Sequence, residues 1–281
     1  MSAPPLDLSL LAIYEQAFSD PERAMSRLYD MAKRDQWDSE SLPWDQANFD
    51  GVPLPLREAL AGLYTQIHYG EVASLIAAAR CVEHAPDLGS RLFASTQVMD
   101  EARHVEWFTR LIRKLDCRPP VHPAVAALID DIHRDATPEG LLIGMQLLVE
   151  GLAQSLFQEG GRLLRGLDVS DPMFAPLSGV VTVLGDWMVN YVGRDESRHV
   201  AFGILQVGRR IRLLPPAQVD VLQRRTEQWG GLVLAIAADQ EPRFATLGLD
   251  AGAFARRCIG DLNGRLRQAG LEVQLPLPGD G

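Results

Sequence analysis

The sequence predicts an all-α protein built around a bundle of four long helices. Apolar residues recur every three or four positions along most of the chain, whereas the alternation typical of strands is almost absent. The motif Asp-Glu-x-Arg-His occurs twice, at 100–104 and at 195–199, in stretches with this helical spacing. Hydrophobic residues make up 47% and charged residues 23% of the chain, which suits a sizeable globular core. Because no linker-like segment divides the 281 residues, we expect one domain over 1–281.

Accessory helices are expected on both sides of the bundle. The N-terminal one should span about 20–36, with Pro21 in its first turn, where a missing backbone N–H is tolerated. Pro43 and Pro53 then predict an irregular connection. We expect the metal-binding bundle at about 55–214. Two accessory helices should follow it within 217–269, at about 217–240 and 251–269.

Proline residues set the bounds of the four long helices, because a proline inside a helix removes a hydrogen bond and clashes with the preceding turn. The first two helices are expected at about 55–85 and 88–115, the second being stopped by Pro119 and Pro120. The third should begin near Pro138 and continue beyond residue 157, and the fourth should span about 176–214.

The repeated motif has the spacing of a metal site. On a helix, residues three apart point in nearly the same direction, so Glu101 lies beside His104 and Glu196 beside His199. Two such helices that face each other bring two carboxylates and two imidazoles together. A four-helix bundle completes a carboxylate-bridged two-metal site with one inward glutamate from each of the other two helices.

Glu71 and Glu150 are the candidates for these two glutamates. Each interrupts an apolar stripe on the helix that precedes one copy of the motif. Burying an unpaired carboxylate costs several kcal/mol, so each needs a cation, a proton or a metal. Glu159 is the rival to Glu150, but nine residues along a helix place it on the opposite face. A single Glu-x-x-His pair would be most simply a solvated pair; two copies in register favour metal binding by Glu71, Glu101, His104, Glu150, Glu196 and His199.

The order Glu, Glu-x-x-His, Glu, Glu-x-x-His resembles that of the ferritin-like di-iron carboxylate superfamily over about 22–212. The similarity is greatest to the branch of the ribonucleotide reductase small subunit, the ligand-binding oxidases and the aminobenzoate N-oxygenases. It includes the upstream segment 28–37, which ends in Trp37. The resemblance implies a ferritin-like bundle and a hydrogen-bonded chain of Trp37, Asp195 and His104, with Asp100 orienting His199 in the same way. The alternative is that both aspartates face solvent.

Two positions depart from the reductase pattern. Phe108 stands four residues after His104, where the reductases usually have a radical-storing tyrosine, and the chain has no tyrosine after Tyr191. The resemblance therefore implies oxidation of a small molecule rather than ribonucleotide reduction. His68 lies three residues before Glu71, so it is either a seventh ligand or a hydrogen-bonded neighbour of the site.

The resulting prediction is a dioxygen-activating oxygenase or oxidase with two iron ions, or with one manganese and one iron. N-oxygenation of an amine is a candidate reaction, and a non-catalytic iron-handling or ferroxidase protein is the alternative. An oxidase should have an enclosed apolar cavity of about 300 Å³ or more beside the metals, whereas iron handling needs a solvent channel to an acidic cage. Glycines near the ligands suggest a pocket beside Gly151 and Gly203, unless they serve close helix packing.

Charge and composition limit the partners. A formal net charge of −10 disfavours nonspecific binding to nucleic acid or to anionic membranes. Apolar stretches such as Leu141–Leu148 are too short to span a bilayer. The spacing of the three cysteines is not that of a disulfide or a metal site, so we expect reduced thiols and a cytoplasmic protein. The chain has no flavin or nicotinamide motif, which implies an external electron donor such as a reductase or ferredoxin. We also expect a homodimer.

Overall fold

The computed structural model describes residues 10–19, 22–135 and 137–278, and the regular structure in these ranges is entirely helical. The all-α prediction is therefore confirmed. On the N-terminal side, α1 (Leu10–Glu15) and the short η1 (Gln16–Phe18) precede α2 (Arg23–Arg34). The expected start of this accessory helix at residues 20 and 21 lies outside the described residues. An irregular segment then leads to the bundle, as Pro43 and Pro53 predict.

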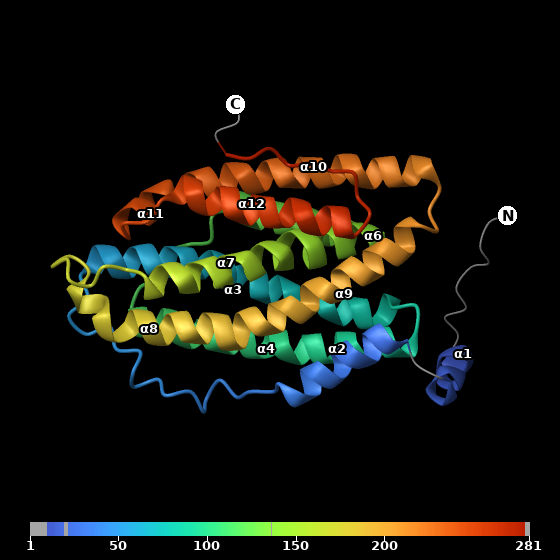
Figure 1. Cartoon of the computed structure of the whole chain (residues 1–281), viewed down its shortest axis with the longest axis horizontal. Helices are drawn as coiled ribbons and strands as arrows, with labels where there is room; N and C mark the ends of the chain where they lie inside the picture. The colour runs from blue at the N-terminus through green and yellow to red at the C-terminus, as the bar shows by residue number, and fades with distance from the viewer. Residues whose placement is uncertain (1–9, 20–21, 136, 279–281) are drawn as a thin grey trace.

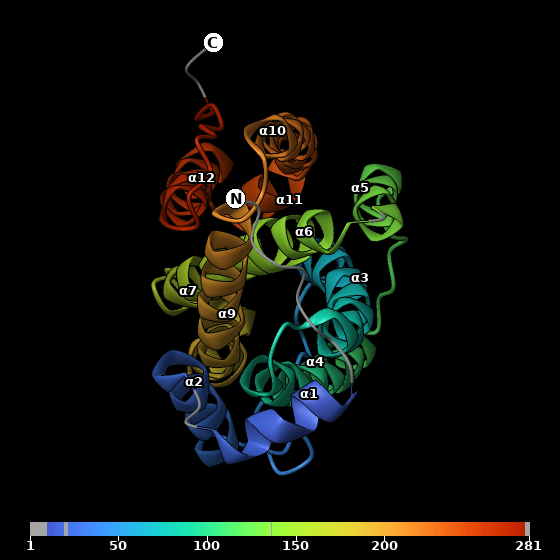
Figure 2. The same ribbon diagram turned by 90° about the vertical axis from the view of Figure 1, so that its right-hand side faces the viewer.

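Four long helical stretches run side by side and form the bundle (Figure 1). Viewed nearly along their axes, α3, α4, α7 and α9 surround a common centre (Figure 2). The first two stretches are α3 (Leu54–His84) and α4 (Leu88–Leu115). The third comprises α6 (Pro138–Leu141), η2 (Leu142–Val149) and α7 (Glu150–Arg165), and the fourth comprises η3 (Ala175–Leu177), α8 (Ser178–Trp187), η4 (Met188–Val192) and α9 (Gly193–Ile211).

The segments η2 and η4 are π-helical, which the sequence analysis did not predict. η2 ends immediately before Glu150, and η4 ends four residues before Glu196. Gly193 closes η4, and a Cβ atom there would lie 2.8 Å from the carbonyl oxygen of Met188. The wider π turn thus requires a residue without a side chain at this position. Insertions of this kind occur frequently at functional sites, because they re-aim the side chains that follow.

Further helices cover one side of the bundle. α10 (Pro216–Asp239) and α12 (Ala251–Gln268) confirm the two predicted C-terminal helices, and α11 (Glu241–Thr246) joins them. Figure 2 shows these helices beyond α6 and α7, on the opposite side of the bundle from α2. α5 (Pro123–Arg134) was not expected from the sequence, although its buried residues Val125, Leu128, Ile129 and Ile132 have helical spacing.

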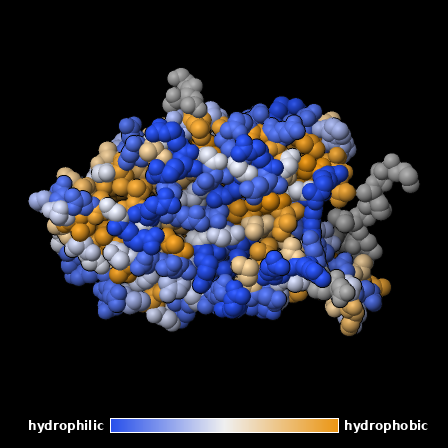
Figure 3. Space-filling model, in the orientation of Figure 1, coloured by the Kyte–Doolittle hydropathy of each residue, from blue (hydrophilic) through white to orange (hydrophobic). Residues whose placement is uncertain are grey.

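One continuous helical stretch, Pro138–Arg165, is long and apolar enough to cross a membrane by length and composition alone. Of its most apolar window, 72% is buried inside the protein, as in the core helix of a globular bundle. The molecular face in Figure 3 is largely hydrophilic and is interrupted by separate hydrophobic areas. The apolar character of this stretch is therefore explained by its central place in the bundle.

Candidate metal centre

Six side chains from the four bundle helices meet in the interior. Each is at most 4% exposed. Their oxygen and nitrogen atoms form two groups in which the atoms lie within 4.8 Å of one another. The first group is Glu71, Glu101, His104 and Glu196, and the second is Glu101, Glu150, Glu196 and His199. Glu101 and Glu196 belong to both groups, so they lie between two adjacent positions that could each hold a cation.

Each imidazole faces three carboxylates through Nδ1. In the first group, Nδ1 of His104 lies 3.1 Å from Glu71 Oε2 and 3.1 Å from Glu196 Oε1. In the second, Nδ1 of His199 lies 3.1 Å from Glu101 Oε1 and 3.2 Å from Glu196 Oε2. The sequence spacing brings each Glu and His of one motif together, and the tertiary fold adds the glutamates of the other helices.

Three carboxylate oxygens in this cluster have no hydrogen-bond partner among the described residues, although they are buried. They are Glu101 Oε2, Glu150 Oε1 and Glu196 Oε1; the first and the last lie 3.4 Å and 3.1 Å from His104 Nδ1 but without the geometry of a hydrogen bond. Buried acceptors without a donor are rare in folded proteins because desolvation is then uncompensated. Carboxylate oxygens together with imidazole nitrogens are the donors that iron and manganese accept. The cluster therefore fits two such cations.

Without a metal ion, the raised pKa values of Glu71 and Glu196 favour protonated carboxyl groups in the cluster. Burial raises the pKa of Glu71 to about 8, although the His104 imidazole acts against it. Burial and the neighbouring Glu150 raise the pKa of Glu196 well above its usual range. Burial would also raise the pKa of Glu101, but His199 and His104 outweigh it and hold that pKa below its usual range.

The pKa values of the two imidazoles shift in the direction opposite to the one that burial alone would cause. Burial alone would lower the pKa of His104, but Glu71 and the other nearby carboxylates raise it well above the usual value. Glu101 and Glu196 do the same for His199. The raised pKa values favour the protonated imidazoles when no cation is bound, and binding of cations at Nδ1 would release protons.

The aspartate of each motif contacts the histidine of the other motif. Asp195 Oδ2 lies 3.4 Å from His104 Nε2, and Asp100 Oδ2 lies 3.2 Å from His199 Nε2. Both aspartates are fully buried and do not face solvent. Trp37 Nε1 donates a hydrogen bond of 2.7 Å to Asp195 Oδ2, which extends the chain from His104 toward α2. These contacts orient the imidazoles so that Nδ1 points into the cluster.

The arginines of the two motifs were not assigned a role by the sequence analysis. Arg198 Nη2 donates to Asp195 Oδ1 at 2.6 Å and to Asp100 Oδ2 at 3.2 Å. Arg103 Nη2 also donates to Asp100, and it lies 3.4 Å from Asp195 Oδ2. Two guanidinium groups therefore neutralise two aspartates between the motifs. The signal was present in the sequence, since the arginine is repeated at the same place in both motifs.

His68 and Phe108 belong to neither group of candidate ligands. His68 Nε2 lies 2.9 Å from Thr109 Oγ1, so its ring has a hydrogen-bond partner on α4. The buried Phe108 ring packs against Tyr64 and Phe157, with ring centroids 6.0 Å and 5.8 Å away.

The rival Glu159 lies elsewhere. It pairs with Arg257 at 2.7 Å and with Arg162 at 2.8 Å. Its carboxylate therefore has cationic partners outside the cluster, as its position on the opposite helix face predicts.

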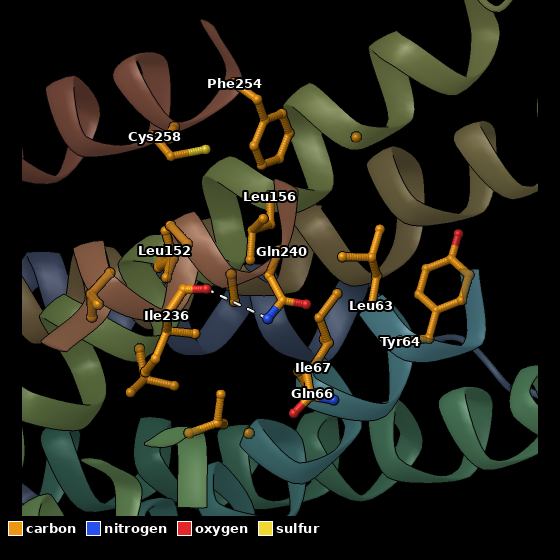
Figure 4. Close-up of a pocket in the computed structure, with 18 of the residues that line it drawn as sticks. Leu63, Tyr64, Gln66, Ile67, Leu152, Leu156, Ile236, Gln240, Phe254 and Cys258 are labelled. Atoms are coloured by element: carbon orange, nitrogen blue, oxygen red, sulfur yellow. Dashed lines mark hydrogen bonds between the residues drawn. The ribbon is translucent and has the colours of Figure 1, made fainter. Parts of the chain in front are cut away.

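An apolar cavity of about 250 Å³ reaches the cluster. Its walls come from α3, α5, α7 and the C-terminal helices, and Figure 4 shows aliphatic side chains of α3 and α7 pointing into it. Glu71 and Glu150 are the charged side chains among the described residues that line it. The volume is somewhat below the expected 300 Å³, but the apolar lining and the contact with the cluster are as expected for an oxidase.

The prediction of a pocket beside Gly151 and Gly203 is wrong, because neither residue lines the cavity. A Cβ atom on Gly203 would lie 2.7 Å from Cβ of Gln146, so this glycine allows α9 to pack closely on η2. Gly151 faces α12, where a Cβ atom would lie 3.5 Å from Leu262 Cδ1. The cavity lies on another side of the cluster, where Gly70 forms part of its wall.

No protein-family model matches the sequence, and no curated protein matches it. Solved structures do resemble the fold. An R2-like ligand-binding oxidase variant with an aerobically reconstituted Mn/Fe cofactor has a TM-score of 0.61 and 22% identity, over 89% of this chain and 94% of its own. Another variant, with an anaerobically reconstituted Mn/Fe cofactor, has a TM-score of 0.62 and 21% identity, over 89% and 95%.

A further R2-like ligand-binding oxidase, with an aerobically reconstituted metal cofactor after photoconversion, has a TM-score of 0.60 and 22% identity, over 89% of this chain and 94% of its own. The chain has the fold of these oxidases. At this level of identity the likeness establishes the fold alone, and the fold is the ferritin-like bundle implied by the sequence resemblance.

Proposed function

We propose that this protein is an enzyme, a dinuclear-metal oxidase or oxygenase that uses dioxygen to oxidise a small organic molecule. The observation that carries the proposal is the contact between the apolar cavity and the buried cluster at Glu71 and Glu150. A cluster that only stabilised the fold would not need such a cavity. The fold of the R2-like ligand-binding oxidases supports the same conclusion.

In this proposal one metal ion is held by Glu71 and His104 and the other by Glu150 and His199, with Glu101 and Glu196 between them. The ions are two irons, or one manganese and one iron as in the Mn/Fe cofactor of the similar structures. When bound, the metal pair supplies the electrons with which dioxygen is reduced.

The protein residues around the cluster position it and keep it dry. Asp100 and Asp195 accept hydrogen bonds from the imidazole Nε2 atoms, which leaves Nδ1 free to bind metal. Phe108 cannot be oxidised to a phenoxyl radical, so oxidising equivalents pass to a bound molecule instead of being stored at this position. The apolar cavity excludes water that would otherwise compete with the substrate.

The cavity lining favours a substrate with an apolar body. A charged amine would lose its hydration there and would find a partner only at Glu71 or Glu150. N-oxygenation therefore remains a candidate only for an amine whose nitrogen is uncharged and placed at the cluster. The alternative of an iron-handling protein is less favoured, because iron ions need a polar path rather than an aliphatic cavity.

Three further parts of the proposal concern the surroundings of the enzyme. Repeated turnover requires an external electron donor such as a reductase or ferredoxin. We also propose a homodimer and a cytoplasmic location, in line with the expectations from the sequence.

Anaerobic reconstitution tests the function. The protein is loaded with ferrous iron alone or with manganese and iron, its metal content is measured, and it is exposed once to dioxygen with candidate apolar molecules. We expect about two ions per chain and an oxidised organic product detected by mass spectrometry. Uptake of iron followed by release of ferric iron, with every organic molecule unchanged, would support the iron-handling alternative.

A further inference from the structure

Two fully buried glutamines lie beside the metal cluster on a side that the apolar cavity does not reach. Gln97 on α4 and Gln146 on η2 are both 0% exposed, and neither of them lines the cavity. Gln97 stands four residues before Glu101, and Gln146 stands four residues before Glu150. Four residues are about one helical turn, so each amide lies one turn from a glutamate of the cluster.

The hydrogen-bonding atoms of the two amides are mostly without partners among the described residues. Gln97 Nε2 donates to Glu101 Oε1 at 3.0 Å, but Gln97 Oε1 accepts no hydrogen bond. In Gln146, neither Nε2 nor Oε1 has a partner. Native proteins almost always pair buried amide groups with other protein groups or with ordered water, because an unpaired one loses its hydration without compensation. The two side chains therefore require an occupant that both donates and accepts hydrogen bonds.

Both glutamines lie next to α9, within one helical turn of each other along its axis. Gln97 Nε2 lies 3.0 Å and His199 Nδ1 lies 3.1 Å from the same oxygen, Glu101 Oε1. One turn after His199, Gly203 lies against η2, since a Cβ atom on this glycine would be 2.7 Å from Gln146 Cβ. The glycine has no side chain that could separate the two amides.

An aromatic pair closes this part of the interior on the side away from the cluster. Phe93 lies one turn before Gln97 on α4, and its ring centroid is 5.0 Å from that of Phe202 on α9. Beyond the pair, Gln206 Nε2 donates to Ser90 Oγ at 2.8 Å. Both contacts show that α4 and α9 run antiparallel, so the two amides lie between the aromatic rings and the metal cluster.

We propose that Gln97 and Gln146 together bind a water molecule beside the second group of ligands, which contains Glu150. Water both donates and accepts hydrogen bonds, and a buried water molecule typically has about three polar partners. Gln97 Oε1 is an acceptor, and the amide of Gln146 adds one nitrogen donor and one oxygen acceptor. A larger polar molecule is disfavoured, because Gly203 already brings α9 close to η2.

The two groups of candidate ligands thus have different surroundings. One turn before Glu71, in the first group, stands Ile67, which lines the apolar cavity. One turn before Glu196 stands Val192, which is fully buried. An apolar molecule therefore meets the cluster from the cavity, whereas water is held on the side of the two amides. The water site rests on the buried amides alone, so it goes beyond the proposed function and does not depend on it.

A double-mutant cycle tests whether the two glutamines share one occupant. Gln97→Met and Gln146→Met keep side chains of similar length but remove the hydrogen-bonding atoms. In the full-length, metal-loaded protein, each single variant should lower the thermal midpoint, because the water loses a partner. The double variant should lose clearly less than the sum of the two single losses, because one substitution already releases the shared water. Metal content is measured for every variant, so that loss of a cation is recognised separately.

Gln240→Met is the matched control, since this buried glutamine has partners of its own, Arg243 and the carbonyl oxygen of Ile236. Combined with Gln146→Met, it should give a loss equal to the sum of the single losses. A raised thermal midpoint in Gln146→Met would overturn the inference, because it would mean that the amide is buried without any partner. Additive losses for Gln97→Met and Gln146→Met would also overturn it.

A crystal structure of the metal-loaded protein observes the occupant directly. We expect an ordered water molecule at hydrogen-bond distance, about 2.7–3.2 Å, from both amides, and its loss in Gln146→Met. A direct hydrogen bond from Gln146 to Gln97 or to Glu150, without a water molecule, would contradict the proposal. If the water molecule is present but no organic molecule is oxidised after reconstitution, the water site stands and the proposed oxidase function fails.

Discussion

At the scale of single residues, the centre of this protein is a set of buried charges arranged with near two-fold repetition. The aspartate of each motif reaches the histidine of the other, and both arginines lie between the aspartates. Removing one member of such a network leaves its partner buried and uncompensated. This explains why the two motifs share the aspartate and the arginine as well as the glutamate and the histidine.

The glutamates common to both candidate positions should be indispensable for metal binding. We expect Glu101→Ala and Glu196→Ala to lose most of both ions, because each removes an oxygen donor from both positions. Glu159→Ala is the matched control, since this buried glutamate pairs with arginines outside the cluster. Metal analysis of the three purified proteins measures the effect. Two ions per chain in Glu101→Ala and Glu196→Ala would refute the assignment.

Stability should depend on pH more strongly without metal than with it. The pKa of Glu71 is raised from 4.5 to about 8, so the contribution of its neutral form is complete below about 4.5 and is lost as the pH rises through 8. The raised pKa values of the two imidazoles act in the same direction. We expect the thermal midpoint of the metal-free protein to fall between pH 5 and about 8 and that of the metal-loaded protein to fall less.

Thermal melts of both forms across this range measure the difference. The reason is that deprotonation removes stability from the empty cluster but supplies charge that holds the cations. A gap between the two melting curves that narrows with rising pH would contradict this account.

At the scale of secondary-structure elements, the π-helical segments η2 and η4 decide how α7 and α9 present their glutamates. Both segments lie on the side of the bundle that supplies Glu150 and Glu196. A π turn has a wider spacing than an α turn, so it rotates the residues that follow it relative to those before. The two π-helical segments thus change the directions in which Glu150 and Glu196 point, compared with an uninterrupted α-helix.

Gly193→Ala tests the need for the turn at η4. The added methyl group would lie 2.8 Å from the Met188 carbonyl oxygen, so the segment must shift, at a cost of about 1–3 kcal/mol in unfolding free energy. Gly231→Ala is the control, because no atom outside the local backbone of α10 lies within 4 Å of its Cβ position and alanine is favoured in helices by about 1 kcal/mol. Denaturant unfolding measures both. A Gly193→Ala protein as stable as Gly231→Ala would show that the π turn tolerates a side chain.

At the scale of the whole molecule, the C-terminal helices have a function beyond packing. α10, α11 and α12 supply one wall of the cavity, while α3 and α7 supply the wall that carries Glu71 and Glu150. The four-helix bundle alone would therefore leave this space open on one side. With the accessory helices in place, the metal cluster faces an apolar cavity that has walls on both sides.

Filling this space should block substrate oxidation without removing the metals. Ala153 lines the cavity three residues after Glu150, and Ala153→Phe would occupy part of its volume of about 250 Å³. Gln158→Phe, on the exposed face of the same helix, is the control. We expect Ala153→Phe to retain two ions per chain and to reduce product formation at least tenfold. Product yield and metal content are measured together, and normal yield from Ala153→Phe would remove the cavity from the proposed mechanism.

The sequence by itself determined the all-α class and the approximate ranges of the long helices, because these follow from local periodicity and from prolines. It also singled out the six candidate ligands, since buried carboxylates at helical spacing need a partner wherever the helices finally pack. No helix was predicted between Pro120 and Pro138, so α5 was missed even though its apolar residues have helical spacing.

Only the tertiary structure decided where the cavity lies and what closes it. The glycines near the ligands suggested a pocket beside Gly203, yet this residue packs against Gln146, and the cavity is on the side of Gly70. The exchange of aspartates between the motifs is likewise a set of contacts between distant segments. A single sequence carries the period of each helix, but the face that one helix turns toward another depends on how all side chains fill the interior together.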